Sequence, residues 1–124
     1  YIAPYGRVRD LTKPELNIAY AETYLAYLLG TKIVDGDVVN LLVAYNAGIG
    51  NAKKWKARAR SGGDQLLFME SLPSRETRFY VDQVLRSLLI YRLKFKQSRD
   101  DFLAFTEGGT LPYVSQDRAG VSKF

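Results

Sequence analysis

The longest periodic stretch of the chain lies between positions 74 and 95. Apolar residues recur there at alternating steps of three and four, and two further leucines widen the stripe: Val81, Val84, Leu85, Leu88, Leu89, Tyr91 and Phe95. This spacing places the side chains on one face of an α-helix. Ser74, which follows a proline, can cap the start of that helix. A long helix with one apolar face has to be covered by other elements, so the sequence predicts a core built around it.

The first part of the chain carries a second strong helix signal. Thr12 is placed as an N-cap, with Glu15 three residues later and Pro14 in the first turn. These signals predict a helix over residues 13–29 that ends at Gly30. Its expected core stripe consists of Ile18, Ala21, Leu25, Leu28 and Leu29.

Shorter helices are predicted over residues 37–45, from near Asn51 to Arg60, over 64–70 and over 100–105. No segment alternates apolar and polar residues as a half-buried strand does. We therefore predict an all-α fold in a single domain over residues 1–124. Its helical core spans residues 10–95, and an irregular tail over 106–124 docks through Leu111, Tyr113 and Val114.

The composition excludes several kinds of chemistry. With no cysteine and no histidine, disulfides, thiolate catalysis, zinc sites of the usual kind and histidine triads are ruled out. The net charge of +5 favours an anionic partner such as nucleic acid, an acidic membrane surface or a bacterial wall. No apolar run is long enough to predict a membrane span. Because the chain starts at Tyr1 and its single methionine is Met69, we expect a processed or truncated piece.

One candidate site lies in AYNAGIGNAKKW, residues 44–55, where one helix pattern stops and a basic one begins. Asn46 offers a hydrogen-bond donor and an acceptor, and Tyr45 offers a flat ring with a hydroxyl, a pairing that suits sugars. Gly48 allows the chain to turn and to be approached closely. The alternative interpretation is a helix C-cap followed by a turn, with Tyr45 in the core.

A second candidate lies in ESLPSRETRFYV, residues 70–81. Glu76 and Tyr80 are four positions apart, so they share one face of the long helix near its positive end. They could therefore serve as a pair. The alternative makes Glu76 an ordinary first-turn acid and Tyr80 a core residue whose hydroxyl is hydrogen-bonded.

Taken together, the two stretches resemble the C-terminal two-thirds of the soluble lytic transglycosylase domain, a family related in fold to goose-type lysozyme. The resemblance rests on AYNAG-x-G before a basic helix with Trp55, and on E-S-L-P-x-x-E-T-R-x-Y-V further along the chain. It covers residues 10–95 and implies a lysozyme-like helical domain. The helices over 37–45 and 74–95 should then pack together and bring Tyr45 and Tyr80 to one concavity.

The resemblance also implies a function. The family cleaves the bond between N-acetylmuramic acid and N-acetylglucosamine in peptidoglycan, and forms a 1,6-anhydro sugar without a metal or another cofactor. One glutamate acts first as acid and then as base. Tyr45 and Asn46 would line the glycan groove, Glu76 would contact the peptide stem at its edge, and Tyr80 would stand in the wall. Such a substrate implies the periplasm or the cell envelope.

The resemblance fails at the catalytic residue. In the family this glutamate stands in an E-S dipeptide upstream of a GLMQ-like motif, and neither is present, so we expect both upstream of Tyr1. That segment would be removed, undescribed or present as a separate chain. Glu70-Ser71 imitates the dipeptide, but it matches a non-catalytic E-S of the family. Ile49 replaces a common proline, and Glu22 is expected to be a solvated or paired acid.

The sequence is also compatible with two other functions. A non-catalytic peptidoglycan-binding or scaffold protein would keep the groove without the acid. A nucleic-acid binder is suggested by the basic residues 53–60 around Trp55. It is disfavoured because a basic helix is usually a solvated face and the tryptophan is better explained as its core anchor.

Overall fold

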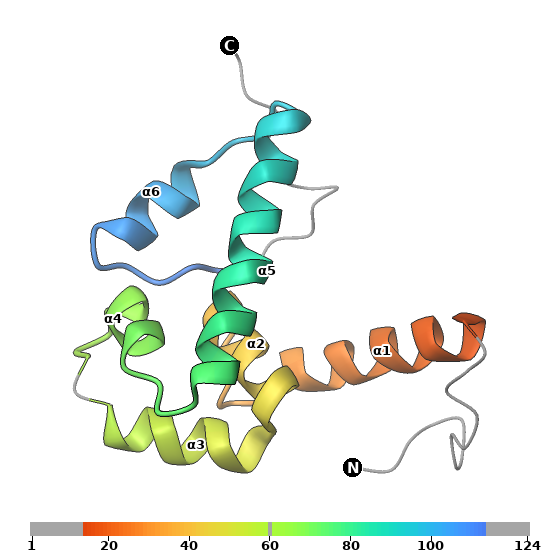
Figure 1. Ribbon diagram of the computed structural model, residues 1–124, viewed down its shortest axis with the longest axis horizontal. Coiled ribbons are helices and arrows are strands. Elements are labelled where there is room, and N and C mark those ends of the chain that lie inside the picture. The colour runs from red at the N-terminus through yellow and green to blue at the C-terminus, as the bar shows by residue number, and fades with distance from the viewer. Residues whose placement is uncertain (1–13, 60, 114–124) are drawn as a thin grey trace.

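The computed structural model describes residues 14–59 and 61–113, which form six helices and no strand (Figure 1). The helices are α1 Pro14–Leu29, α2 Val38–Ala47, α3 Ile49–Arg58, α4 Gln65–Glu70, α5 Arg75–Lys94 and α6 Asp100–Thr106. The predicted all-α fold is confirmed. The helix start at Thr12 and the tail beyond Tyr113 lie outside the described residues.

Three helices begin where the sequence places a capping side chain. Asp37 accepts a hydrogen bond from the backbone N–H of Asn40 at 3.1 Å, at the start of α2. Asp64 and Ser74 cap α4 and α5 in the same way, over 3.0 and 3.1 Å. Each cap satisfies a backbone donor that the first turn of a helix leaves without a partner.

Helix α2 lies at the centre of the fold. Its residues 38–44 are all buried, and it contacts α1, α3 and α5. Helix α4 packs against α5 and α6, on the side of α5 where Figure 1 shows both short helices. The fully buried side chains of the core come from several elements: Leu28, Val34, Val39, Val43, Phe68, Leu72, Val81 and Leu111. Among the described residues, no helix combines the length and the apolar character that a membrane crossing requires.

Three residues assigned to the core stripes are exposed, so those predictions are wrong. Ile18 is 60% exposed because the first turns of α1 project away from the other helices (Figure 1). Tyr91 and Phe95, 41% and 52% exposed, pack against each other at the end of α5, with ring centroids 4.6 Å apart. Earlier in α5, Val81 and Leu85 are buried as predicted.

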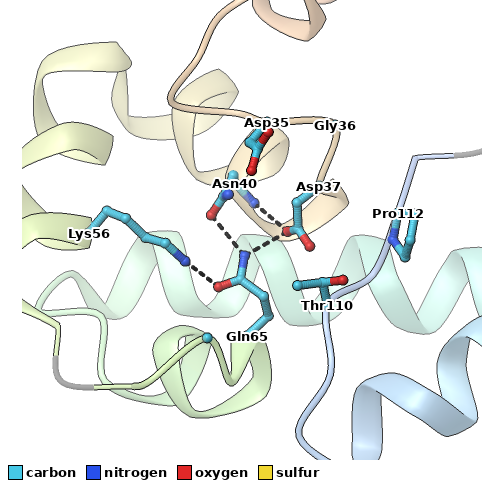
Figure 2. A pocket seen from close by; sticks show the side chains of 9 residues that line it. Asp35, Gly36, Asp37, Asn40, Lys56, Gln65, Thr110 and Pro112 are labelled. Atoms are coloured by element: carbon cyan, nitrogen blue, oxygen red, sulfur yellow. Dashed lines mark hydrogen bonds between the residues drawn. The ribbon is translucent and has the colours of Figure 1, made fainter.

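A buried polar cluster made of Asp37, Asn40, Lys56 and Gln65 joins α2, α3 and α4 (Figure 2). The Gln65 side-chain N–H group donates to Asp37 at 2.7 Å and to Asn40 at 2.9 Å. Lys56 donates to the carbonyl oxygen of Gln65. Burial lowers the pKa of the Lys56 ammonium, while the negative charges of Asp37 and Asp35 raise it. The cluster therefore places a carboxylate and a cation at opposite ends of one amide.

The segment after α6 docks on the same carboxylate. The second oxygen of Asp37 accepts the backbone N–H of Leu111 at 2.8 Å, and Leu111 accepts the N–H of Val38 at 2.8 Å. Tyr113 donates its backbone N–H to Gly36 at 2.6 Å, although its side chain is exposed. Of the three predicted docking residues, Leu111 is buried, Tyr113 is held by its backbone, and Val114 lies outside the described residues.

Asp37→Asn should lower the free energy of unfolding by about 2–3 kcal/mol, because a new N–H group would face donors that the carboxylate now satisfies. Urea unfolding followed by circular dichroism measures the change. The matched control is Asp35→Asn, an exposed neighbour in a left-handed conformation that asparagine tolerates. It should change stability by less than about 0.5 kcal/mol. Equal stability of the two variants would contradict the role of Asp37.

Candidate functional site

A row of tyrosines crosses three helices at the centre of the molecule. In α1, the rings of Tyr20 and Tyr27 lie 6.4 Å on either side of Tyr24. Tyr24 then contacts Tyr45 of α2 at 5.7 Å, and Tyr45 stacks on Tyr80 of α5 at 6.4 Å with an interplanar angle of 14°. We call these five residues the tyrosine row. The predicted packing of α2 against α5 is present, and it brings Tyr45 and Tyr80 together.

Asn46 is held at the end of α2 by a bond to α5. Its side-chain oxygen accepts the hydroxyl hydrogen of Thr77 at 2.8 Å. Thr77 is itself buried, and its backbone N–H donates to Ser74. Asn46 is exposed, so a ligand can reach the amide that this bond orients. The two motifs singled out in the sequence are therefore joined by one side-chain hydrogen bond.

The half-buried Tyr80 phenol is neutral near neutral pH, as an ordinary tyrosine is, and its surroundings disfavour ionisation further. Burial raises the pKa of the Tyr80 phenol, and negative charge on the neighbouring Tyr45 raises it further. A neutral phenol can both donate and accept a hydrogen bond. Tyr45 is also half-buried, so each ring has an apolar contact on one side and a polar hydroxyl. This arrangement suits a sugar ring with its alternating C–H and O–H groups.

The glutamates of the second motif are exposed. Glu76 stands in the first turn of α5, next to Thr77 and four positions before Tyr80, as expected. Glu70 ends α4 and lines an open depression of about 380 Å³. The other residues of that depression are Met69, Arg75, Arg78, Phe79, Asp82 and Arg86. Glu70 thus lies beside arginines, in a depression that contains no member of the tyrosine row.

The turn between α2 and α3 consists of Gly48 alone. Its backbone has φ 92° and ψ 156°, a conformation open essentially only to glycine. Its N–H donates to Ala44 at 2.9 Å, which closes the last turn of α2. The predicted stop at Asn46-Ala47-Gly48 is confirmed, and α3 starts at Ile49, earlier than expected. The tight turn leaves Asn46 at the end of one helix and close to the start of the next.

Two parts of this site were not predicted from the sequence. Tyr20, Tyr24 and Tyr27 follow one another at steps of four and three, a spacing that marks one face of α1 and could have identified the row. Thr77 carried no such signal, because its bond to Asn46 joins residues that are 31 positions apart. Within residues 14–59 and 61–113, no three acidic, histidine or cysteine side chains gather as metal ligands would.

The helical architecture is that of a lysozyme-like all-α domain. Residues 4–68 match the family model of the transglycosylase SLT domain, and the chain belongs to this family. No solved structure matches the chain significantly.

Curated relatives match most of the chain. It is 32% identical over 108 residues to the soluble lytic murein transglycosylase of Escherichia coli strain K12, which covers 87% of this chain and 16% of the relative. The protein of the same name from Salmonella typhimurium strain LT2 is 34% identical over 91 residues, which are 73% of this chain and 14% of the relative. A putative soluble lytic murein transglycosylase of Haemophilus influenzae is 33% identical over 90 residues, which are 73% of this chain and 15% of the relative. The matched region is thus 14–16% of these relatives' own length.

Gly48→Ala should lower the free energy of unfolding by about 1–3 kcal/mol, because a Cβ strains this backbone conformation even though nothing crowds it. Gly50 offers the matched control: it lies inside α3, its added Cβ also meets open space, and its φ is ordinary. Gly50→Ala should leave stability unchanged or raise it by up to about 1 kcal/mol. The unfolding temperatures of both variants test this prediction. Equal shifts in the two variants would contradict the claim that alanine is strained at position 48.

Proposed function

We propose that this chain supplies the glycan-binding part of a peptidoglycan lytic transglycosylase. The enzyme would cleave the bond between N-acetylmuramic acid and N-acetylglucosamine and leave a 1,6-anhydro product. The observation that carries the proposal is the meeting of the two motifs, in which Tyr45 stacks on Tyr80 and Asn46 accepts a hydrogen bond from Thr77. Family membership and the names of the curated relatives support the same activity.

In this proposal Tyr45 and Asn46 contact the glycan strand. The Asn46 side chain is oriented by Thr77 and keeps N–H groups that can donate to a sugar hydroxyl or an acetamido carbonyl. Tyr80 stands behind Tyr45 as part of the wall, and its neutral phenol avoids placing a negative charge beside the reacting sugar. Glu76, exposed at the start of α5, contacts the peptide stem at the groove edge.

We place the acid/base glutamate outside residues 1–124. Its role is to protonate the oxygen that leaves and then to take the proton of the muramic C6 hydroxyl as that oxygen attacks C1. A carboxyl group that gives a proton near neutral pH needs surroundings that disfavour its charge. Glu70 and Glu76 lack such surroundings, since both are exposed and Glu70 lines one depression with Arg75. The substrate places the enzyme in the periplasm or the cell envelope.

The first test asks whether the 124 residues can cleave on their own. The isolated chain should bind purified glycan strands weakly and release no anhydromuropeptides. A longer protein that adds the glutamate-bearing segment should release them, measured by chromatography and mass spectrometry. Release by the isolated chain that Glu76→Gln or Glu70→Gln abolishes would place the acid within this sequence. Binding without release by the longer protein would favour the non-catalytic peptidoglycan-binding alternative.

In the active longer protein, Tyr45→Ala or Asn46→Ala should reduce turnover by about 10- to 1000-fold while the fold is kept, because each removes a group that positions the sugar. The matched control is Tyr91→Ala, which removes an exposed tyrosine outside the row. It should change turnover by less than about 3-fold, in line with an ordinary surface position. Wild-type turnover in Tyr45→Phe combined with Asn46→Ala would show that the stretch is only a turn.

A further inference from the structure

A second pocket lies between α3, α4 and the short loop that leads into α5. Its volume is about 300 Å³, and its lining residues are Trp55, Arg58, Ala59, Phe68, Ser71, Leu72 and Pro73. The floor is apolar, since Phe68 and Leu72 are 1% and 2% exposed. We call this the Trp55 pocket. None of its lining residues belongs to the tyrosine row, and a pocket of this size accommodates only a small group.

The charges around the Trp55 pocket have one sign. Arg58 lines the pocket and is exposed, while no acidic residue is among the lining residues described. The ammonium of Lys56 lies 4.3 Å from the centroid of the Phe68 ring, which forms the floor. The Ser71 hydroxyl donates to the Phe68 carbonyl at 2.8 Å, so its oxygen is left as an acceptor beside the arginine. An apolar floor beneath a guanidinium fits a short aliphatic group that ends in a carboxylate.

We propose that the Trp55 pocket binds the carboxyl-terminal alanine of a peptidoglycan stem peptide. The alanine methyl group packs on Phe68 and Leu72, beside the half-buried Trp55 ring. The terminal carboxylate pairs with the Arg58 guanidinium, which can hold both oxygens. This inference rests on the proposed function for its ligand, and it assigns a binding site apart from the glycan-contacting residues Tyr45 and Asn46.

The pocket residues Trp55 and Pro73 are close along the chain to the proposed glycan site around Asn46. Trp55 lies six residues after Ile49 in α3, about 9 Å along the helix axis from the turn that follows Asn46. On the other side, Pro73 is separated by a single residue, the Ser74 cap, from the α5 turn that contains Thr77, the partner of Asn46. An extended peptide of about four residues spans roughly 13 Å. A stem attached to a sugar beside Asn46 is therefore long enough to span the distance from the turn to Trp55 along α3.

Trp55 provides the reporter for the test, because it is the only tryptophan of the chain. A synthetic stem tetrapeptide that ends in D-alanine is titrated into the 124-residue chain, and tryptophan fluorescence is followed. The same peptide with a C-terminal amide is the matched ligand. We expect the free acid to change the fluorescence saturably, and the amide to bind at least about 10-fold more weakly, since a hydrogen-bonded charge is lost.

Variants of α3 identify the cation. Arg58→Gln should weaken binding of the free acid by about 10-fold or more and abolish the difference between acid and amide. Arg58→Lys should restore part of that difference, because it keeps the charge without the planar fork. Lys53→Gln is the matched control, an exposed cation of α3 that does not line the pocket. It should change the dissociation constant by less than about 2-fold.

Equal binding of acid and amide, or equal effects of Arg58→Gln and Lys53→Gln, would overturn the proposal. So would a fluorescence that does not respond to the peptide. The titration needs neither sugar nor bond cleavage, so its failure removes the stem site and leaves the glycan proposal standing. Conversely, peptide binding that depends on Arg58, in a longer protein that does not cleave glycan strands, would overturn the proposed enzyme activity alone.

Discussion

The carboxylate of Asp37 is the interaction on which the central helix depends. Burial of an ionised carboxylate costs several kcal/mol unless hydrogen bonds replace its water. Here three N–H groups do so, from Asn40, Gln65 and Leu111. These donors come from α2 itself, from α4 and from the segment after α6, so the carboxylate fixes where α2 begins and what lies against its first turn. Displacement of any one of these elements would leave charge or donors buried without partners.

The two ends of α2 have different roles: the first turn stabilises the fold, and the last turn carries the residues proposed to bind the glycan. At its first turn the polar groups are buried and hydrogen-bonded to one another, although they line a small pocket (Figure 2). At its last turn Asn46 is exposed, and among the described residues its side chain is bound through its oxygen to Thr77. Because residues 38–44 between the two ends are buried, α2 cannot slide or rotate without disturbing the core. Fixation of the Asp37 end therefore fixes the position of Tyr45 and Asn46.

Most local signals in the sequence predict the structure, whereas polar contacts between residues distant in the sequence could not be predicted from it. The Ser74 cap acts within one turn of α5, so the sequence alone reveals it. The pairing of Tyr45 with Tyr80 was expected because both tyrosines lie next to apolar stripes and because two motifs resemble one family. The Asn46–Thr77 bond and the link from Asp37 to Leu111 carry no periodic signal, since polar partners need proximity rather than spacing. The prediction that Ile18 is in the core was wrong for a related reason. Periodicity identifies which face of a helix is apolar, but not whether another element covers that face.

The short connection between α2 and α3 fixes the two proposed binding regions relative to each other. Gly48 adds no flexible linker, so the direction of α3 follows from the end of α2, and the Asn46–Thr77 bond ties the start of α5 to the same point. A substrate held at Tyr45 by its sugar and at Arg58 by its peptide would thus be bound at two positions on a rigid frame. Two-point attachment restricts rotation of the sugar about the strand axis. A sugar held in one orientation presents its glycosidic oxygen to the catalytic carboxyl group in one geometry, which proton transfer requires.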